Sequence, residues 1–275
     1  MVNDILCNVF VRVSRGVWRW MRRAAAVSNP QAAGRRRSMQ LHEQFLTDYT
    51  VLRLLEEAPS SLLQVITFTP RQEARLGADM EMWFHQRDRW LGIRIQAKVL
   101  KDGRYFPNLH NDGGKQTNTL IQKAANNGML PLYLLYIGPY QPGLPSHSPC
   151  GCALCWRLCG NVVYWRFGNW WIRASAVKDL YPKMALRELW KDMSPWQCLV
   201  CCPGRFTLEA LRENAAQRGL FKEEKGEEEW RIFDGVSALP SHVQAVLEGK
   251  DVTSGEEASL PRHLLIWNMD AFAEE

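Results

Sequence analysis

The sequence has no run of about 18 uncharged apolar residues, so it lacks the segment that a membrane-spanning helix requires. It contains no internal repeat and no phosphate-binding loop of the P-loop type. Its six histidines show no spacing typical of a catalytic triad or of metal ligands, which leaves nucleophilic catalysis without support. With 46% hydrophobic and 23% charged residues over 275 positions, the composition is that of a globular protein with a sizeable core.

Acidic side chains are scarce at one end of the chain and concentrated at the other. Residues 1–38 hold eight arginines against one acid, Asp4, a net charge of +7, and residues 39–205 hold 19 basic and 13 acidic side chains. Residues 206–275 hold seven basic and 15 acidic side chains, a net charge of −8, so the whole chain carries only +5. A basic body with an acidic tail is compatible with a polyanionic partner, DNA first and RNA second.

Residues 5–23 have the pattern of a basic amphipathic helix. Its apolar stripe would consist of Leu6, Val9, Phe10, Val13, Val17, Trp20 and Met21. We predict that residues 1–38 form a basic arm, disordered or belonging to a start misassigned upstream of Met39, with no membrane contact. The alternative is that the stripe packs inward, because exposed tryptophan is costly.

Eight cysteines are present without an evident signal peptide, which favours buried thiols in a reducing cytoplasm. Four of them crowd into residues 150–159, and Cys198 and Cys201 lie further on. Cys150 with Cys152 and Cys198 with Cys201 could form the two knuckles of a structural zinc site. Against this, Leu199-Val200 between the second pair has the pattern of a strand, and cysteines are often buried as small hydrophobic residues. We therefore expect no zinc.

The order of predicted elements is that of an α/β (α+β) protein with a mixed central sheet flanked by helices. Helices are predicted at 40–57, 115–127, 207–217 and 241–248, and strands at 63–68, 78–84, 90–100, 132–137, 162–167, 171–174, 199–201 and 264–267. Residues 39–205 are expected to form the core, with a Cys-rich insertion at 141–160 and a charged loop at 222–229. Residues 206–275 are expected to be an acidic extension packed on that core.

The predicted hairpin at 78–100 carries the most informative polar residues. Because side chains alternate along a strand, one face of the hairpin collects Asp79, Glu81, Trp83, Arg94, Gln96 and Lys98, whereas the other face is apolar. A carboxylate, an amide oxygen and an ammonium group on neighbouring strands suit a Mg²⁺ site with a charge-stabilising lysine. The alternative is a cross-strand ion pair between Asp79 and Lys98 on a solvated face, worth well under about 1 kcal/mol.

The hairpin resembles the PD-(D/E)xK nuclease superfamily over about residues 40–137. The matching motifs are Gly77-Ala78-Asp79 and Gln96-Ala97-Lys98, with the order helix, strand, hairpin, helix around them. The closest likeness is to the restriction-endonuclease-like, Mrr-type branch, in which Gln replaces the second acid. The chain also resembles a bacterial protein family in which these motifs recur with Pro131-Leu132-Tyr133 and a Pro-Trp-x-Cys-Leu-Val-Cys segment, here residues 195–201.

The resemblance implies a role for each matching residue. Asp79 would bind the metal with the Gln96 side-chain oxygen and the backbone carbonyl of Ala97, and Lys98 would be the catalytic lysine. Glu43, in the opening helix, would hold a metal-bound water or a second metal. Two departures weaken the match, since no proline precedes Asp79 and Gln96 removes one negative charge.

Three further residues are expected to support the site. They are Glu81 as a partial replacement for the missing charge, Arg94 as a phosphate contact, and Gln116 as a polar residue behind the site. The function implied is a Mg²⁺-dependent endonuclease, with Mn²⁺ as a substitute, of bacterial defence or genome maintenance. It would act on DNA, with a partner protein supplying target choice. The alternative is a catalytically inactive nucleic-acid-binding or partner-binding protein on the same fold.

Overall fold

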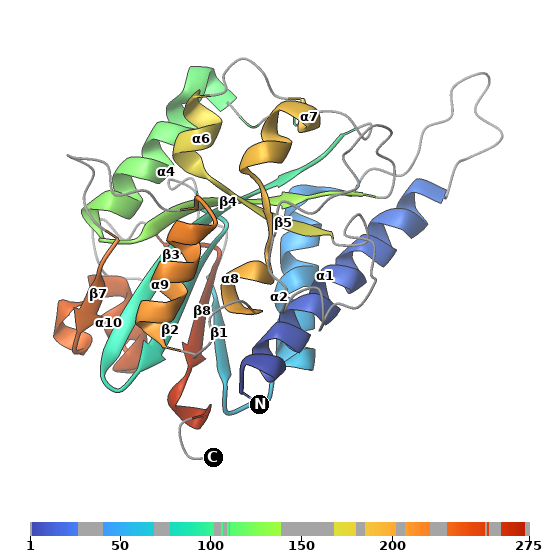
Figure 1. Cartoon of the computed structure of the whole chain (residues 1–275). Helices are drawn as coiled ribbons and strands as arrows, with labels where there is room; N and C mark the ends of the chain where they lie inside the picture. The colour runs from blue at the N-terminus through green and yellow to red at the C-terminus, as the bar shows by residue number, and fades with distance from the viewer. Residues whose placement is uncertain are drawn as a thin grey trace, which may run out of the picture.

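The computed structural model describes residues 2–26, 41–68, 78–101, 106, 109, 111–138, 168–179, 185–201, 207–220, 230–250, 252 and 260–272 (Figure 1). The α-helices are α1 (Val2–Ala26), α2 (Glu43–Glu57), α4 (Lys115–Asn126), α6 (Ala174–Asp179), α7 (Leu186–Leu189), α8 (Cys198–Cys201), α9 (Leu208–Gln217) and α10 (Ser241–Leu247). The strands are β1 (Leu63–Thr67), β2 (Met80–Gln86), β3 (Arg89–Val99), β4 (Leu130–Tyr136), β5 (Asn169–Arg173), β6 (Ser194–Pro195), β7 (Ile232–Asp234) and β8 (His263–Asn268). Short 3-10 helices are η1 (Asn111–Gly114), η3 (Trp190–Asp192), η4 (Val236–Ala238) and η6 (Asp270–Phe272).

The strands form one mixed sheet in the order β1-β8-β2-β3-β4-β5-β6, with β7 paired to β3. The β2–β3 hairpin is antiparallel, whereas β3 runs parallel to β4 and β2 runs parallel to β8. The hairpin turns at Arg87 and Asp88, both of which have positive φ, as a tight two-residue turn requires. The predicted mixed sheet flanked by helices is confirmed.

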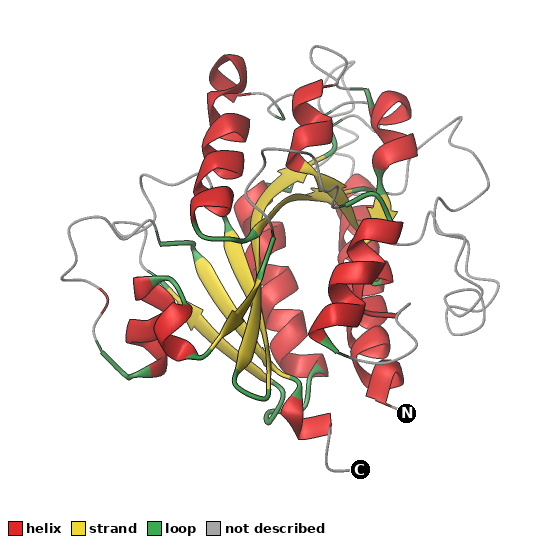
Figure 2. Cartoon of the chain, turned by 60° about the vertical axis from the view of Figure 1, so that its left-hand side comes forward, coloured by secondary structure: helices red, strands yellow, loops and turns green. Residues whose placement is uncertain are grey.

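Helices cover both faces of the sheet (Figure 2). The predicted apolar face of the hairpin, with Met80 and Met82, belongs to the main core together with residues of α1, α2, α8 and α9. The other face carries Trp83, which packs with Ala124 of α4 and Val243 of α10 in a second core cluster. Glycine at position 92 makes room for the Trp83 ring, because a Cβ there would lie 2.8 Å from it. Both faces of the central hairpin are therefore buried.

Most predicted elements occur within a few residues of their expected bounds. The exception is 199–201, predicted as a strand, which belongs to helix α8. The backbone N–H groups of Leu199 and Val200 donate to the carbonyls of Trp196 and Gln197 in a tight helical turn. A short apolar run does not distinguish a buried strand from a buried helical turn, which explains the error. The predicted insertion at 141–160, strand at 162–167 and charged loop at 222–229 lie outside the described residues.

Helix α1 is part of the core, so the prediction of a peripheral basic arm is wrong for residues 2–26. It packs antiparallel to α2, with Arg12 Nη1 lying 3.3 Å from Glu57 Oε2 near one end and the Trp20 and Phe45 rings 6.0 Å apart near the other. Side chains of its apolar stripe are fully buried: Leu6, Phe10, Val13 and Val17. The indole N–H of Trp196 donates to the carbonyl of Phe10 at 2.8 Å. Packing the stripe against the sheet layer removes from water the apolar surface that an arm would leave exposed.

The C-terminal region also belongs to the sheet, so its description as an extension packed on the core is wrong for β8. This strand lies between β1 and β2 and pairs with both along its whole length. Its apolar residues Leu264 and Leu265 are fully buried. The strand itself was predicted at 264–267, but the acidic composition of residues 206–275 does not reveal that it lies inside the sheet.

No helix within the described ranges is both long enough and apolar enough to cross a membrane. The cysteines differ in state, since Cys198 is a buried thiol whereas Cys7 is disulfide-bonded. The prediction of buried thiols is therefore wrong for Cys7. The cluster at 150–159, on which the zinc alternative depends, lies outside the described residues.

Candidate metal and phosphate site

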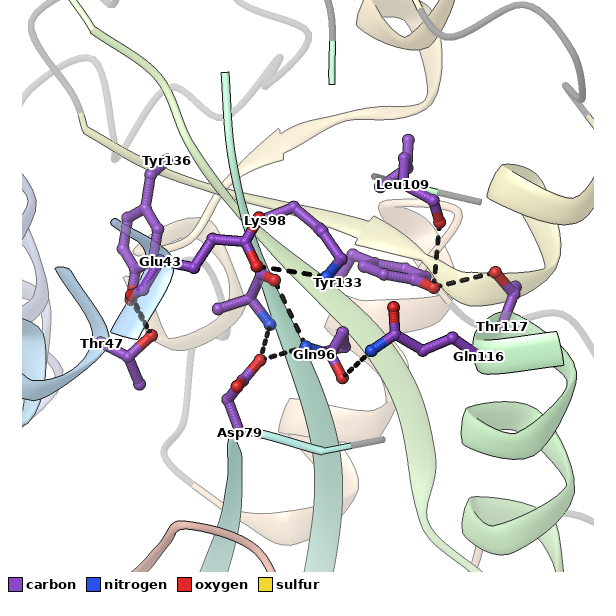
Figure 3. Close-up of polar contacts among 11 residues, drawn as sticks. Glu43, Thr47, Asp79, Gln96, Lys98, Leu109, Gln116, Thr117, Tyr133 and Tyr136 are labelled. Atoms are coloured by element: carbon purple, nitrogen blue, oxygen red, sulfur yellow. Dashed lines mark hydrogen bonds and ion pairs between the residues drawn. The ribbon is translucent and has the colours of Figure 1, made fainter. Parts of the chain in front are cut away.

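The candidate site lies where β2 begins beside the end of β3, next to the first turns of α2 and α4 (Figure 3). Asp79 directly precedes β2, and its N–H donates to the carbonyl of Ile95 at 2.8 Å. This bond extends the hairpin register by one residue and brings the Asp79 side chain level with Gln96. The local alternation of the strands thus explains why the two motifs meet although 17 positions separate them.

The Asp79 carboxylate is held by two donors from β3. Its Oδ2 accepts the Ala97 N–H at 2.6 Å and a hydrogen bond from the side-chain amide of Gln96. The same amide nitrogen lies 3.4 Å from the Ala97 carbonyl oxygen. The Asp79 carboxylate and the Ala97 carbonyl therefore converge on one point, where an amide N–H donor bridges them.

Gln96 is fixed from its other side by α4. Its Oε1 accepts from Nε2 of Gln116, the second residue of that helix, at 3.1 Å. The Oε1 of Gln116 is buried and has no hydrogen-bond partner among the described residues. If the side-chain amides of Gln96 and Gln116 each turned by 180°, the Gln96 NH₂ group would donate to the Gln116 oxygen. The Gln96 oxygen would then face Asp79.

Lys98 binds the opening helix. Its ammonium nitrogen lies 3.2 Å from Oε2 of Glu43, and the Lys98 side chain is 4% exposed whereas that of Glu43 is 28% exposed. A buried ammonium group requires such an anionic partner. The sequence alternative of an Asp79–Lys98 pair on a solvated face does not describe this arrangement. Thr47 donates to the Glu43 carbonyl at 2.9 Å and accepts from Tyr136 at 3.3 Å, which fixes the first turn of α2.

Tyr133 lies beside the site and was not predicted as part of it. Its hydroxyl lies 2.9 Å from Oγ1 of Thr117 and 3.4 Å from the Leu109 carbonyl. Burial raises the pKa of Tyr133 to about 12, and the nearby carboxylates of Asp79 and Glu43 add to the rise, although the hydrogen bond from Thr117 opposes it. The phenol is therefore neutral at physiological pH and acts only through its hydroxyl group.

A second set of residues that sequence reasoning missed supports Asp79 from β8. The His263 N–H donates to the Asp79 carbonyl at 3.2 Å, and its ring lies between Oγ1 of Thr67 at 3.0 Å and Oδ1 of Asp48 at 2.8 Å. Arg262 also donates to Asp48, at 2.8 and 2.9 Å. These contacts join α2, β1 and β8 behind Asp79. They depend on the position of β8, so no local sequence signal could have found them.

Glu81 and Arg94 lie on the expected face but do not reach the candidate site. Both are fully buried, and the Arg94 guanidinium donates to the Glu81 carboxylate. The same carboxylate binds His242 of α10 at 2.8 Å and Trp83 Nε1 at 3.3 Å. The predictions that Glu81 replaces the missing charge of the site and that Arg94 contacts phosphate are therefore wrong. Helix α10 covers this part of the hairpin, so a phosphate cannot reach Arg94 there.

The buried network predicts an acid-sensitive contribution to stability. Burial by itself would raise the pKa of Glu81, but the charges of His242 and Arg94 outweigh it and leave that pKa below its usual range. Glu81→Gln should lower the free energy of unfolding by about 3–5 kcal/mol at neutral pH, since it leaves buried charges uncompensated. Because the folded pKa is lowered, this difference should shrink as pH falls below the unfolded value of about 4.3.

Urea unfolding at neutral pH and at about pH 3.5 measures both effects. The matched control is Glu209→Gln, since Glu209 pairs with Arg89 at the surface and its side chain is 53% exposed. That substitution should change stability by less than about 1 kcal/mol. If both substitutions lowered the free energy of unfolding equally at neutral pH, the buried network would contribute no more to stability than a surface ion pair.

The donor set suits a hard cation. The described residues contain no group of three or more His, Cys, Asp or Glu side chains arranged to hold a metal. Mg²⁺, however, commonly binds through one or two carboxylates and completes its shell with water and substrate phosphate. Asp79 and the Ala97 carbonyl already converge on one point, and rotation of the Gln96 amide would add a third oxygen. Glu43 is 28% exposed and lies at the same end of β3. The residues present therefore fit Mg²⁺.

A family model described as a family of unknown function, DUF6615, matches residues 6–271. The match includes α1, the candidate site and β8. No curated protein and no solved structure matches the chain.

Proposed function

We propose that this chain, which belongs to the DUF6615 family, is a Mg²⁺-dependent nuclease of the PD-(D/E)xK type. The observation that carries the proposal is the meeting of Asp79, the Ala97 carbonyl and Gln96 with the Lys98 ammonium at one end of β3. Oxygen donors for a hard cation stand beside a buried positive charge, an arrangement suited to phosphodiester hydrolysis. The likeness of the two motifs to the nuclease superfamily supports the same conclusion.

Each residue of the site would have a separate task. Asp79, Ala97 and Gln96 would hold Mg²⁺, which when bound neutralises phosphate charge and acidifies a coordinated water. Lys98 would stabilise the negative charge that develops on the phosphate and orient the attacking water. Glu43 holds the Lys98 ammonium in place and would lie within reach of that water. Tyr133 would remain a neutral hydroxyl at the wall of the site.

The preferred substrate in this proposal is DNA, cleaved internally in bacterial defence or genome maintenance, with RNA as the second substrate and a partner protein supplying target choice. We place the activity in the cytoplasm; the Cys7 disulfide is the observation against this location. Gln96 favours a second candidate, a catalytically inactive nucleic-acid-binding or partner-binding protein, because it leaves the site one carboxylate short.

Replacing Gln96 by Glu tests the metal site without relying on catalysis. In the metal-free protein the new carboxylate would face Asp79, and the repulsion should lower the melting temperature. Adding Mg²⁺ or Mn²⁺ should relieve that repulsion and raise the melting temperature more in Gln96→Glu than in the wild type, by several degrees at millimolar metal. Thermal unfolding with and without metal measures the difference.

The control for this experiment is Gln64→Glu, which adds the same charge at an exposed position of strand β1, away from the site. It should show no metal-dependent gain in melting temperature. A Gln96→Glu variant whose melting temperature does not respond to either metal would argue against cation binding between Asp79 and Ala97, and would favour the inactive alternative.

A further inference from the structure

Two exposed aromatic rings and one half-buried ring form a cluster on helices α1 and α2, which lie side by side in Figure 1. The Trp20 ring lies 6.0 Å from Phe45 and 5.9 Å from Tyr49, and the Phe45 and Tyr49 rings are stacked at an interplanar angle of 11°. Trp20 is 37% exposed and Phe45 is 43% exposed. The rest of the apolar stripe of α1 is buried, so these rings are not simply the edge of a poorly packed helix.

Two exposed arginines of α1 flank Trp20, namely Arg19 directly before it and Arg23 three residues after it. The whole helix contains a single acid, Asp4. Arg22 lies over Trp18 instead, with its guanidinium 5.5 Å from the centre of that ring, about half a turn around the helix from Trp20. Burial raises the pKa of Tyr49, and the charges of Arg53 and, to a smaller extent, Arg23 oppose this rise. Flat rings are therefore accompanied by positive charge, a combination that suits bases and phosphates.

The cluster and the candidate site share the first turn of α2, on opposite sides of that helix. Phe45 lies two residues after Glu43, which is about 3 Å along the axis of α2 and about half a turn around it. A helix with its side chains is about 10–12 Å wide, so a bound chain that crosses the beginning of α2 could touch both Phe45 and the site around Glu43.

We infer that Trp20, Phe45 and Tyr49 form a stacking platform for unpaired bases of a single-stranded nucleic acid, whose phosphates contact Arg19 and Arg23. This inference rests on the proposed nuclease function and names the form of substrate that reaches the site. Duplex bases are stacked on each other and do not present their faces to side chains, which favours a single strand over a duplex. A membrane is disfavoured because the apolar stripe of α1 is already buried in the core.

The inference can be tested without catalysis by measuring binding to a fluorescent oligothymidylate of about 20 nucleotides in EDTA. Fluorescence anisotropy reports the binding. Trp20→Ala and Phe45→Leu should each weaken binding by roughly five- to hundredfold, the loss typical of one base–ring contact. The matched control is Leu52→Ala, since Leu52 is 51% exposed on the same helix but is not aromatic, and it should leave binding unchanged. Replacing Arg19 and Arg23 by Ser should flatten the slope of log affinity against log salt by about 1.

Three results would overturn the inference. Phe45→Leu binding as tightly as the wild type would show that the ring does not stack, and Leu52→Ala weakening binding as much as Phe45→Leu would indicate an apolar surface for a protein partner. A duplex of the same length bound as tightly as the single strand would also contradict it. Failure of the nuclease proposal is visible separately, as absent cleavage by the wild type in Mg²⁺ while ring-dependent binding in EDTA remains intact. Circular dichroism and melting temperature confirm that each variant is folded.

Discussion

Asp79→Asn and Lys98→Met should each reduce the rate of phosphodiester cleavage by at least about a hundredfold. Asp79→Asn keeps the size of the side chain but removes the charge that would bind the cation. Lys98→Met keeps the length of the buried stem and removes the ammonium group that faces Glu43. The measurement is the rate of nicking of a supercoiled plasmid in Mg²⁺, with each variant compared to the wild type at equal concentration.

The matched control for Lys98 is Lys178→Met, because Lys178 is an exposed lysine of α6 and the control makes the same chemical change. Its rate should equal that of the wild type. Both site variants should retain the wild-type circular dichroism spectrum, since the Glu43 side chain left behind by Lys98→Met is partly exposed and can be solvated. Nicking at the wild-type rate by either folded variant would remove the residue concerned from the mechanism.

A chain truncated to begin at Met39 should fail to fold, although every residue of the candidate site lies beyond that point. The truncation removes Leu6, Phe10, Val13 and Val17, all of which are fully buried. Loss of a large buried side chain costs about 2–5 kcal/mol. Four such losses match or exceed the roughly 5–15 kcal/mol by which a folded protein is stable. Soluble expression and cooperative thermal unfolding measure the outcome.

The control keeps α1 and removes its charge. A full-length variant with Arg19, Arg22 and Arg23 replaced by Ser should fold and melt within a few degrees of the wild type, because these side chains are exposed. Together the two experiments separate the packing of α1 from its charge. A truncated chain that melts cooperatively near the wild-type temperature would show that α1 is not needed for the core.

The face of the hairpin that carries the site was predictable because it depends only on residues close together in the sequence. Alternation along two adjacent strands is enough to bring Asp79, Gln96 and Lys98 to one face, and the structure has this register. The same alternation predicted Glu81 and Arg94 as site residues and failed, because it does not say what covers the face. Helix α10 comes from about 150 residues later in the chain and buries them.

The contributions of the two ends of the chain were hidden for a related reason. Charge composition described residues 1–38 as an arm and residues 206–275 as an extension, yet α1 lies in the core and β8 lies inside the sheet. Composition averages over a segment, whereas burial is decided residue by residue. The support that His263 gives to the Asp79 backbone depends on this placement of β8 and was therefore beyond sequence reasoning.

The most direct test of the account is incubation of the purified wild-type chain with supercoiled plasmid and with single-stranded circular DNA, in Mg²⁺ and in EDTA. The account predicts that Mg²⁺ supports cleavage of phosphodiester bonds in these substrates and that EDTA abolishes it. It would be contradicted if the folded protein cleaved neither DNA nor RNA in Mg²⁺ or Mn²⁺, or if cleavage continued unchanged in EDTA.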